Sequence, residues 1–280
     1  MSIYSYSDHS LNLPIVSDAE ILEYFKRNKV LTTSKYSNTK ITKSNESSEE
    51  YRTAYVALLP ADYSGEISVC PKSKYCKSGC IFQSGQNTLD IPILSKYYKT
   101  LYFSRFRELF LQQLYRELSN FSALCQRLGV KAAVRLNTYS DIPYETIASG
   151  LFALNIQYYD YTKLIGRFSK PLPDNYDLTY SLVSAETTFY DIHDIATIRQ
   201  IRCSAVFSRE SFKTFFSETM PKFELFSSGV GSVTAVSGEN HDMTFKHDKG
   251  VVLILKDKSP SGQDNPLVYK STRDFMRVTK

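Results

Sequence analysis

The chain has 280 residues, a formal net charge of +5, a hydrophobic share of 42% and a charged share of 22%. That length allows one large domain or two modest ones, and the ordinary apolar content excludes a chain that is disordered throughout. No apolar stretch approaches the ~20 residues of a membrane-spanning helix, and the polar N-terminus is unlike a signal peptide. We therefore expect a soluble, cytoplasmic protein that needs no disulfide to hold its core.

The first 50 residues differ from the rest of the chain. A short helix is predicted over Ser17–Arg27, and the tract Thr32–Glu50 is rich in Ser, Thr, Asn and Lys. That composition offers too few apolar side chains to pack and is typical of a linker or surface loop. We expect an N-terminal extension over residues 1–50, a folded domain over residues 51–262 and a C-terminal tail over residues 263–280.

From residue 51 onward, short runs of β-branched, aromatic and aliphatic residues alternate with helical patterns. Strands are predicted at Ala54–Leu59, Ala132–Leu136, Ile156–Tyr161, Leu178–Val183, Arg202–Val206, Glu224–Phe226 and Val251–Leu255. A long helical region is predicted over Ile93–Leu128, and shorter helices at Tyr144–Leu154, Ile192–Gln200 and Ser211–Met220. Strands separated by helices are typical of a parallel sheet. The pattern predicts an α/β fold, an incomplete (β/α) barrel of about six parallel strands.

In such a barrel the functional side chains lie at the carboxyl ends of the strands. The candidate catalytic residues at these ends are Arg135, Asn137, Asp141, Asp160, Lys163 and Glu186. The candidate cofactor-binding residues are Ser64, Gly65, Asn137 and Ser184. The alternative is structural, because polar residues at strand ends also form hydrogen bonds and core ion pairs, for example between Asp160 and Lys163.

Three of the five cysteines, Cys70, Cys76 and Cys80, lie within eleven residues and are the candidate metal ligands. Structural zinc usually takes four ligands, often in Cys-x-x-Cys pairs, which this loop lacks. Three thiolates alone suit a 4Fe-4S cluster whose remaining iron is open to a substrate or to S-adenosylmethionine. Zinc with a fourth ligand from elsewhere is the alternative. Three unligated thiols in a reducing cell are the third interpretation.

The segment Ile67–Arg107 contains seven basic residues and one acidic residue, and tyrosines lie between the basic ones. Such a pattern is typical of a surface that follows a phosphate backbone and stacks bases. The candidate nucleic-acid contacts are Lys72, Lys74, Lys77, Arg105 and Arg107. We expect an anionic substrate or a nucleic acid as partner, with a solvated helix face as the alternative.

Several segments together resemble the gene product 88 family of bacteriophage and plasmid proteins. They are Leu59–Gly65, Cys70–Cys80, Val134–Asn137, Ser140–Ile142, Gln157–Lys163 and Gly238–Phe245. The resemblance spans roughly Tyr55 to Lys258 and implies a phage- or plasmid-type protein in the cytoplasm of a bacterial host.

The cysteine loop after the first strand is also similar in layout to that of radical S-adenosylmethionine enzymes. It departs from their usual pattern, because five and then three residues separate its cysteines. The resemblance implies an enzyme of this type, with iron–sulfur cluster and S-adenosylmethionine as cofactors. The alternative is a non-enzymatic, nucleic-acid-binding replication protein whose basic loop is stabilised by zinc or a cluster. A structural protein with a vestigial site is the third possibility.

Overall fold

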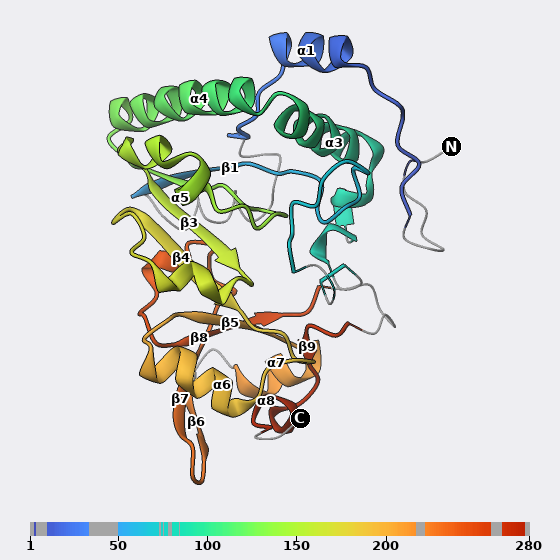
Figure 1. Cartoon of the computed structure of the whole chain (residues 1–280). Coiled ribbons are helices and arrows are strands. Elements are labelled where there is room, and N and C mark those ends of the chain that lie inside the picture. Colours follow the sequence, from blue (N-terminus) through green and yellow to red (C-terminus); the bar gives the residue numbers. More distant parts are fainter. Residues whose placement is uncertain are drawn as a thin grey trace. The chain divides into compact units, whose positions relative to one another are not determined.

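The computed structural model describes residues 3, 10–33, 50–72, 74, 76–77, 80–83, 85–216, 222–258 and 265–277. The fold is mixed α/β with mostly parallel strands, which confirms that part of the prediction (Figure 1). The chain divides into two compact units. The first comprises residues 1–73, 82–160 and 170–177, and the second comprises residues 74–81, 161–169 and 178–280.

In the first unit, β1 (Tyr51–Tyr55), β2 (Lys131–Arg135) and β3 (Gln157–Thr162) pair in parallel in that order. Ala54 lies opposite Val134, and both are fully buried. β1 begins and ends earlier than predicted, because the buried apolar run continues past the strand into the turn that leads to the cysteine loop. The carboxyl ends of β1 and β2 therefore lie side by side.

The region predicted to be helical over Ile93–Leu128 divides into two helices, α3 (Asp90–Arg105) and α4 (Arg107–Arg127). Phe106 separates them with φ −129 and ψ 49, outside the helical region. The break accompanies an edge-to-face contact of Phe103 with Phe110, whose ring centroids are 5.2 Å apart. α4 packs against β2 and brings its buried face to the core of the unit.

The predicted N-terminal helix is present as α1 (Asp18–Arg27), capped by Ser17 and Glu20 in a reciprocal pair. Phe25 of α1 stacks on Tyr102 of α3 with ring centroids 4.3 Å apart, so α1 packs against α3 (Figure 1). Residues 34–49, most of the predicted polar linker, lie outside the described residues.

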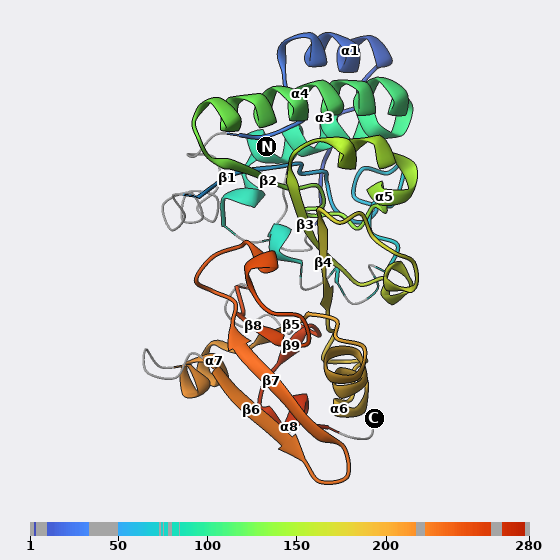
Figure 2. The same cartoon turned by 90° about the vertical axis from the view of Figure 1, so that its left-hand side faces the viewer.

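In the second unit, β4 (Tyr176–Ser181), β5 (Cys203–Phe207), β8 (Val252–Lys256) and β7 (Gly231–Ser237) pair in parallel in that order. β6 (Lys222–Ser227) pairs with β7 in an antiparallel hairpin (Figure 2). β9 (Val268–Tyr269) adds to β5. β7 and β9 were not predicted, since β7 alternates Ser and Thr with apolar residues and β9 has two residues.

The segment predicted as a C-terminal tail contributes to the core of this unit. It contains β9 and α8 (Thr272–Phe275), and the side chains of Tyr269 and Phe275 are fully buried against Phe207. Packing of three aromatic rings fixes this end of the chain to β5.

The remaining helical segments are short. They are α5 (Tyr144–Ile147), α6 (Phe189–His193), α7 (Arg209–Phe215), the π-helical turn Asp194–Ile198 and the 3-10 turns Ile81–Gln83, Gly85–Thr88, Ser149–Ala153, Ile165–Ser169 and Thr244–Lys246. In neither unit do the described strands close into a barrel. No described helix combines the length and the apolar character needed to cross a membrane.

Candidate functional site

Cys70 lies in the first unit, at the end of the loop that leaves β1. The N–H of Val69 donates to the carbonyl oxygen of Ala61 at 3.0 Å, and the N–H of Asp141 donates to the carbonyl oxygen of Val69 at 2.8 Å. The sulfur of Cys70 accepts the N–H of Ala61 at 3.4 Å, and its thiol donates to the carbonyl oxygen of Tyr139 at 3.3 Å. The loops that follow β1 and β2 are therefore joined directly beside this cysteine.

Ala61 adopts a backbone conformation that L-residues other than glycine rarely take. Its φ is 49°, and among the described residues only Gln200 is another non-glycine residue with positive φ. Ala61 is also buried, with 3% of its surface exposed. Such strain persists only where the surrounding structure imposes it, and it is found preferentially at functional sites. Here the conformation directs the N–H of Ala61 at the sulfur of Cys70.

A buried lysine on α3, Lys96, lies over the ring of Tyr139, the residue whose carbonyl oxygen accepts from Cys70. The Nζ of Lys96 lies 5.3 Å from the centre of the Tyr139 ring and 5.6 Å from that of Phe82, and it donates to the carbonyl oxygen of Pro92 at 3.2 Å. Burial, reinforced by the charge of Lys99, lowers the pKa of Lys96 to about 8. Lys96 therefore holds a buried ammonium group over two aromatic rings.

Asn137 and Asp160 form a buried hydrogen-bond network at the carboxyl ends of β2 and β3. The backbone N–H and the Nδ2 of Asn137 donate to the two carboxylate oxygens of Asp160 at 2.7 and 3.2 Å. The Oδ1 of Asn137 accepts from Ser140 and from the N–H of Ile142, both at 2.8 Å. Tyr176 donates its hydroxyl to Asp160 at 2.9 Å. Both predicted catalytic side chains thus brace the loop that carries Tyr139.

The other predicted residues of the first unit lie around the same two loops. The buried Ser64 donates to the carbonyl oxygen of Ile67 at 3.3 Å, and Gly65, with φ 77°, closes the turn after Asp62. Arg135 is half-buried at the end of β2, and Asp141 is buried in the following loop.

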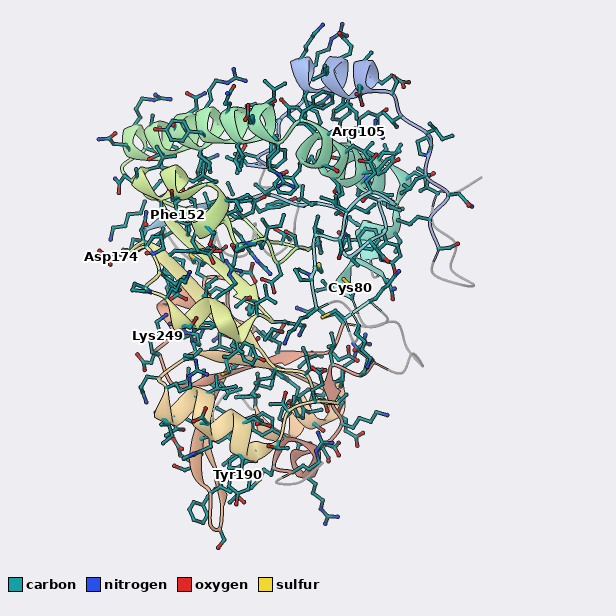
Figure 3. All side chains as sticks on the ribbon, viewed as in Figure 1. Cys80, Arg105, Phe152, Asp174, Tyr190 and Lys249 are labelled. Carbon is teal, nitrogen blue, oxygen red and sulfur yellow. The ribbon has the colours of Figure 1, made fainter. Side chains whose placement is uncertain are left out.

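The second unit carries the rest of the predicted set. Cys76 and Cys80 are half-buried, and Figure 3 marks Cys80. Lys163, predicted as a possible partner of Asp160, donates to the hydroxyl of Ser181 at 2.9 Å. The carbonyl oxygen of Ser184 accepts from Arg277 at 2.6 Å, and Glu186 is exposed.

The predicted nucleic-acid contacts fall into two groups. The guanidinium of Arg105, marked in Figure 3, pairs with Glu66 and with Asp18, the latter at 2.9 Å, and Arg107 lies over the ring of Phe103 at 4.7 Å. The second group, Lys72, Lys74 and Lys77, is exposed in the cysteine loop. Lys96 and Lys99 of the same basic segment are buried, which corrects any expectation that this part of α3 is a solvated cationic face.

The three loop cysteines differ from the other two. Cys125 and Cys203 are buried, and burial raises the pKa of both thiols. In the described part of the chain no three His, Cys, Asp or Glu side chains converge into a group that could hold a metal ion. The N–H of Ala61 is a donor that a thiolate ligand at Cys70 would keep, whereas the bond to the Tyr139 carbonyl oxygen needs the protonated thiol and would be given up on metal binding.

The sequence pattern placed Cys70, Asn137 and Asp160 near strand ends but did not indicate the contacts of Ala61 and Lys96. Only the lysine left a signal, as a basic residue within an apolar helix stripe. The family model of gene product 88 matches residues 29–271, most of the chain. No curated protein and no solved structure matches. The chain belongs to the gene product 88 family.

Proposed function

We propose that this member of the gene product 88 family binds a 4Fe-4S cluster through Cys70, Cys76 and Cys80. The observation that carries the proposal is the N–H of Ala61, held against the Cys70 sulfur by a strained backbone. A neutral surface thiol gains little from such a donor. A metal-bound thiolate gains more, because a hydrogen bond to a charged acceptor is about twice as strong as one to a neutral acceptor.

The three cysteines are near one another along the chain. Five residues separate Cys70 from Cys76 and three separate Cys76 from Cys80. All three are only half-buried, whereas Cys125 and Cys203 are inaccessible. We propose that the three sulfurs come together when the metal binds, because a metal site is rarely preformed before its metal is bound.

The enzymatic form of the proposal is a radical S-adenosylmethionine-like enzyme of a phage- or plasmid-type protein, built on an incomplete barrel. When bound, such a cluster supplies the electron that cleaves S-adenosylmethionine and initiates radical chemistry on the substrate. The chain itself supplies position and charge. Asn137 and Asp160 fix the loop beside Cys70, and the exposed Lys72, Lys74 and Lys77 attract an anionic nucleotide or nucleic acid substrate.

Oxygen-free reconstitution with iron and sulfide tests the cluster. We expect Cys70→Ser, Cys76→Ser and Cys80→Ser each to lose most of the broad absorption near ~400 nm that iron–sulfur proteins show. The matched control is Cys125→Ala, which removes a buried thiol on α4 and leaves the absorption unchanged. Equal iron content in Cys70→Ser and Cys125→Ala would contradict the proposal.

A second candidate function is nucleic-acid binding without catalysis, which the exposure of Lys72, Lys74 and Lys77 favours. In that case zinc or a cluster serves as a clip for the basic loop. Affinity for single-stranded DNA or RNA then falls steeply with salt, and the triple change of these lysines to Ala removes most of that dependence. An unchanged salt dependence in the triple variant excludes this function.

A further inference from the structure

A second pair of metal-ligating side chains lies in the second unit, between β7 and β8. His241 and His247 flank the 3-10 turn Thr244–Lys246, with five residues between them. Their ring centroids are 4.9 Å apart and their planes are tilted by 34°. We propose that these two imidazoles bind one late transition-metal ion of the Zn²⁺ class, at a site separate from the cysteine loop.

The separation of the rings fits joint coordination. Two imidazoles that share a metal at about 2.1 Å have ring centres roughly 4.5–5.2 Å apart, for ligand angles from a right angle to tetrahedral. The observed 4.9 Å lies within that range. Two histidines with three to five residues between them are also a common ligand pair in zinc sites. The turn thus presents both rings at the spacing that one ion requires.

Two buried polar atoms in this turn have no hydrogen-bond partner among the described residues. They are the Nδ1 of His241 and the Oγ1 of Thr244. Thr244 is 2% exposed, so bulk solvent does not serve its hydroxyl. Unsatisfied buried polar atoms are rare in native proteins and often mark an ion or an ordered water. An ion on the imidazole nitrogens, with a coordinated water, satisfies both atoms.

The segment that carries the two rings is fixed at both ends. The carboxylate of Glu239 accepts the N–H of Lys256 at 3.0 Å and pairs with the Nζ of Lys258 at 3.1 Å. At the other end the fully buried Arg202 donates to the carbonyl oxygens of His247 and of Asp248, the latter at 3.0 Å. Lys256 lies in β8 and Arg202 directly precedes β5, so the ligand pair is held in place before an ion binds.

Charges of both signs surround the pair, and for each ring the positive neighbour has the larger effect. Asp242 and Asp248 bring negative charge to the two rings, while Lys246 and Arg202 bring positive charge. Burial is the main reason that the pKa of both imidazoles is lowered. Within the described residues no third His, Cys, Asp or Glu completes a ligand set, which leaves positions for water or an anion.

Metal titration of the full-length chain with all three loop cysteines changed to Ser isolates this site. We expect one Zn²⁺ per chain by calorimetry, and weak Co²⁺ bands without the intense absorption of thiolate ligands. His241→Gln and His247→Gln each lower the affinity at least about tenfold, while the matched control His193→Gln leaves it unchanged. No binding by the folded chain, or equal binding in all three histidine variants, would overturn the proposal.

A second measurement keeps both histidines, so its result does not depend on whether the histidine variants fold. In the same chain without the three loop cysteines, Ni²⁺ is expected to broaden the ring resonances of His241 and His247 selectively in a carbon–proton NMR spectrum. Equal broadening of all histidine resonances means non-specific binding and contradicts the site. Because both tests use a chain without the three loop cysteines, their outcome is independent of the cluster proposal.

Discussion

The backbone N–H of Ala61 donates to the sulfur of Cys70 at 3.4 Å, from a residue whose φ is 49°. Left-handed backbone costs an L-residue roughly 1–2 kcal/mol, so the local structure is maintained against a penalty. The same loop is fastened to Asp141 and Tyr139 after β2. A strained backbone, a half-buried thiol and two strand-end loops thus meet in the first unit.

Substitution at Ala61 separates the effect of the backbone from that of the cysteine. We expect Ala61→Val to lose about 2 kcal/mol of unfolding free energy, since a β-branched residue is poorly tolerated at positive φ. Ala61→Gly, which accepts this φ and keeps the N–H, should stay within about 1 kcal/mol of the parent chain. Urea unfolding measures the unfolding free energy of both variants. Equal stability of the two variants would show that the left-handed conformation is not retained.

Removal of the Asn137 side chain should destabilise the first unit strongly. Asn137→Ala leaves Asp160 and the Ile142 N–H short of partners in a buried setting, which we expect to cost about 3 kcal/mol. Ser140→Ala removes a single bond of the same network and should cost about 1 kcal/mol. Similar losses in both variants, measured by urea unfolding, would contradict the bracing role of Asn137.

The stability of the protein should rise between about pH 8 and pH 10. Burial lowers the pKa of Lys96 and of Lys99 from 10.5 to about 8 in the folded chain. The unfolded chain therefore binds more protons than the folded chain in this interval, and the unfolding free energy increases with pH as the lysines lose their charge.

Replacement of the two lysines tests the assignment. Each contributes about 2 kcal/mol to the rise between pH 8 and pH 10, so Lys96→Met with Lys99→Met should flatten the profile and stabilise the chain at pH 7. The exposed Lys72→Met is the control and should leave the profile unchanged. A profile that is flat in the parent chain, or unaltered in the double variant, contradicts the burial of these charges.

Arg105 and Lys72 should behave differently although both were predicted as nucleic-acid contacts. Arg105 pairs with Glu66 and Asp18, so Arg105→Ala should lower stability by about 1 kcal/mol and leave the salt dependence of nucleic-acid binding intact. Lys72→Ala should leave stability unchanged and reduce the salt slope by about one ion, if the loop contacts phosphate. The reverse pattern would mean that the exposed lysines are not the binding surface.

The sequence predicted the elements whose signals are local. β2, β3 and α1 carry clear apolar periodicity or a cap, and all three are present near the predicted positions. The long helical region was recognised, but its division at Phe106 was not, since the break is a feature of one residue's dihedral angles. β7 was not predicted because its Ser and Thr residues are also typical of a loop.

The candidate site was predictable only in part. The expectation that polar side chains gather at the carboxyl ends of parallel strands placed Asn137 and Asp160 at neighbouring positions. The hydrogen bonds between them are those of the structural alternative, in which polar residues at strand ends bond to one another. The φ of Ala61 and the burial of Lys96 arise from tertiary packing, which no local pattern encodes. The pairing of His241 with His247 likewise depends on anchors from Glu239 and Arg202.

Metal and sulfide analysis of protein purified without oxygen tests the cluster at Cys70, Cys76 and Cys80 most directly. We predict about four iron and four sulfide per chain, with absorption near ~400 nm that bleaches on reduction. Any zinc bound by the histidine pair adds to this total without replacing the iron. Protein that contains zinc but neither iron nor sulfide, and that takes up no iron on reconstitution, would contradict the proposed function.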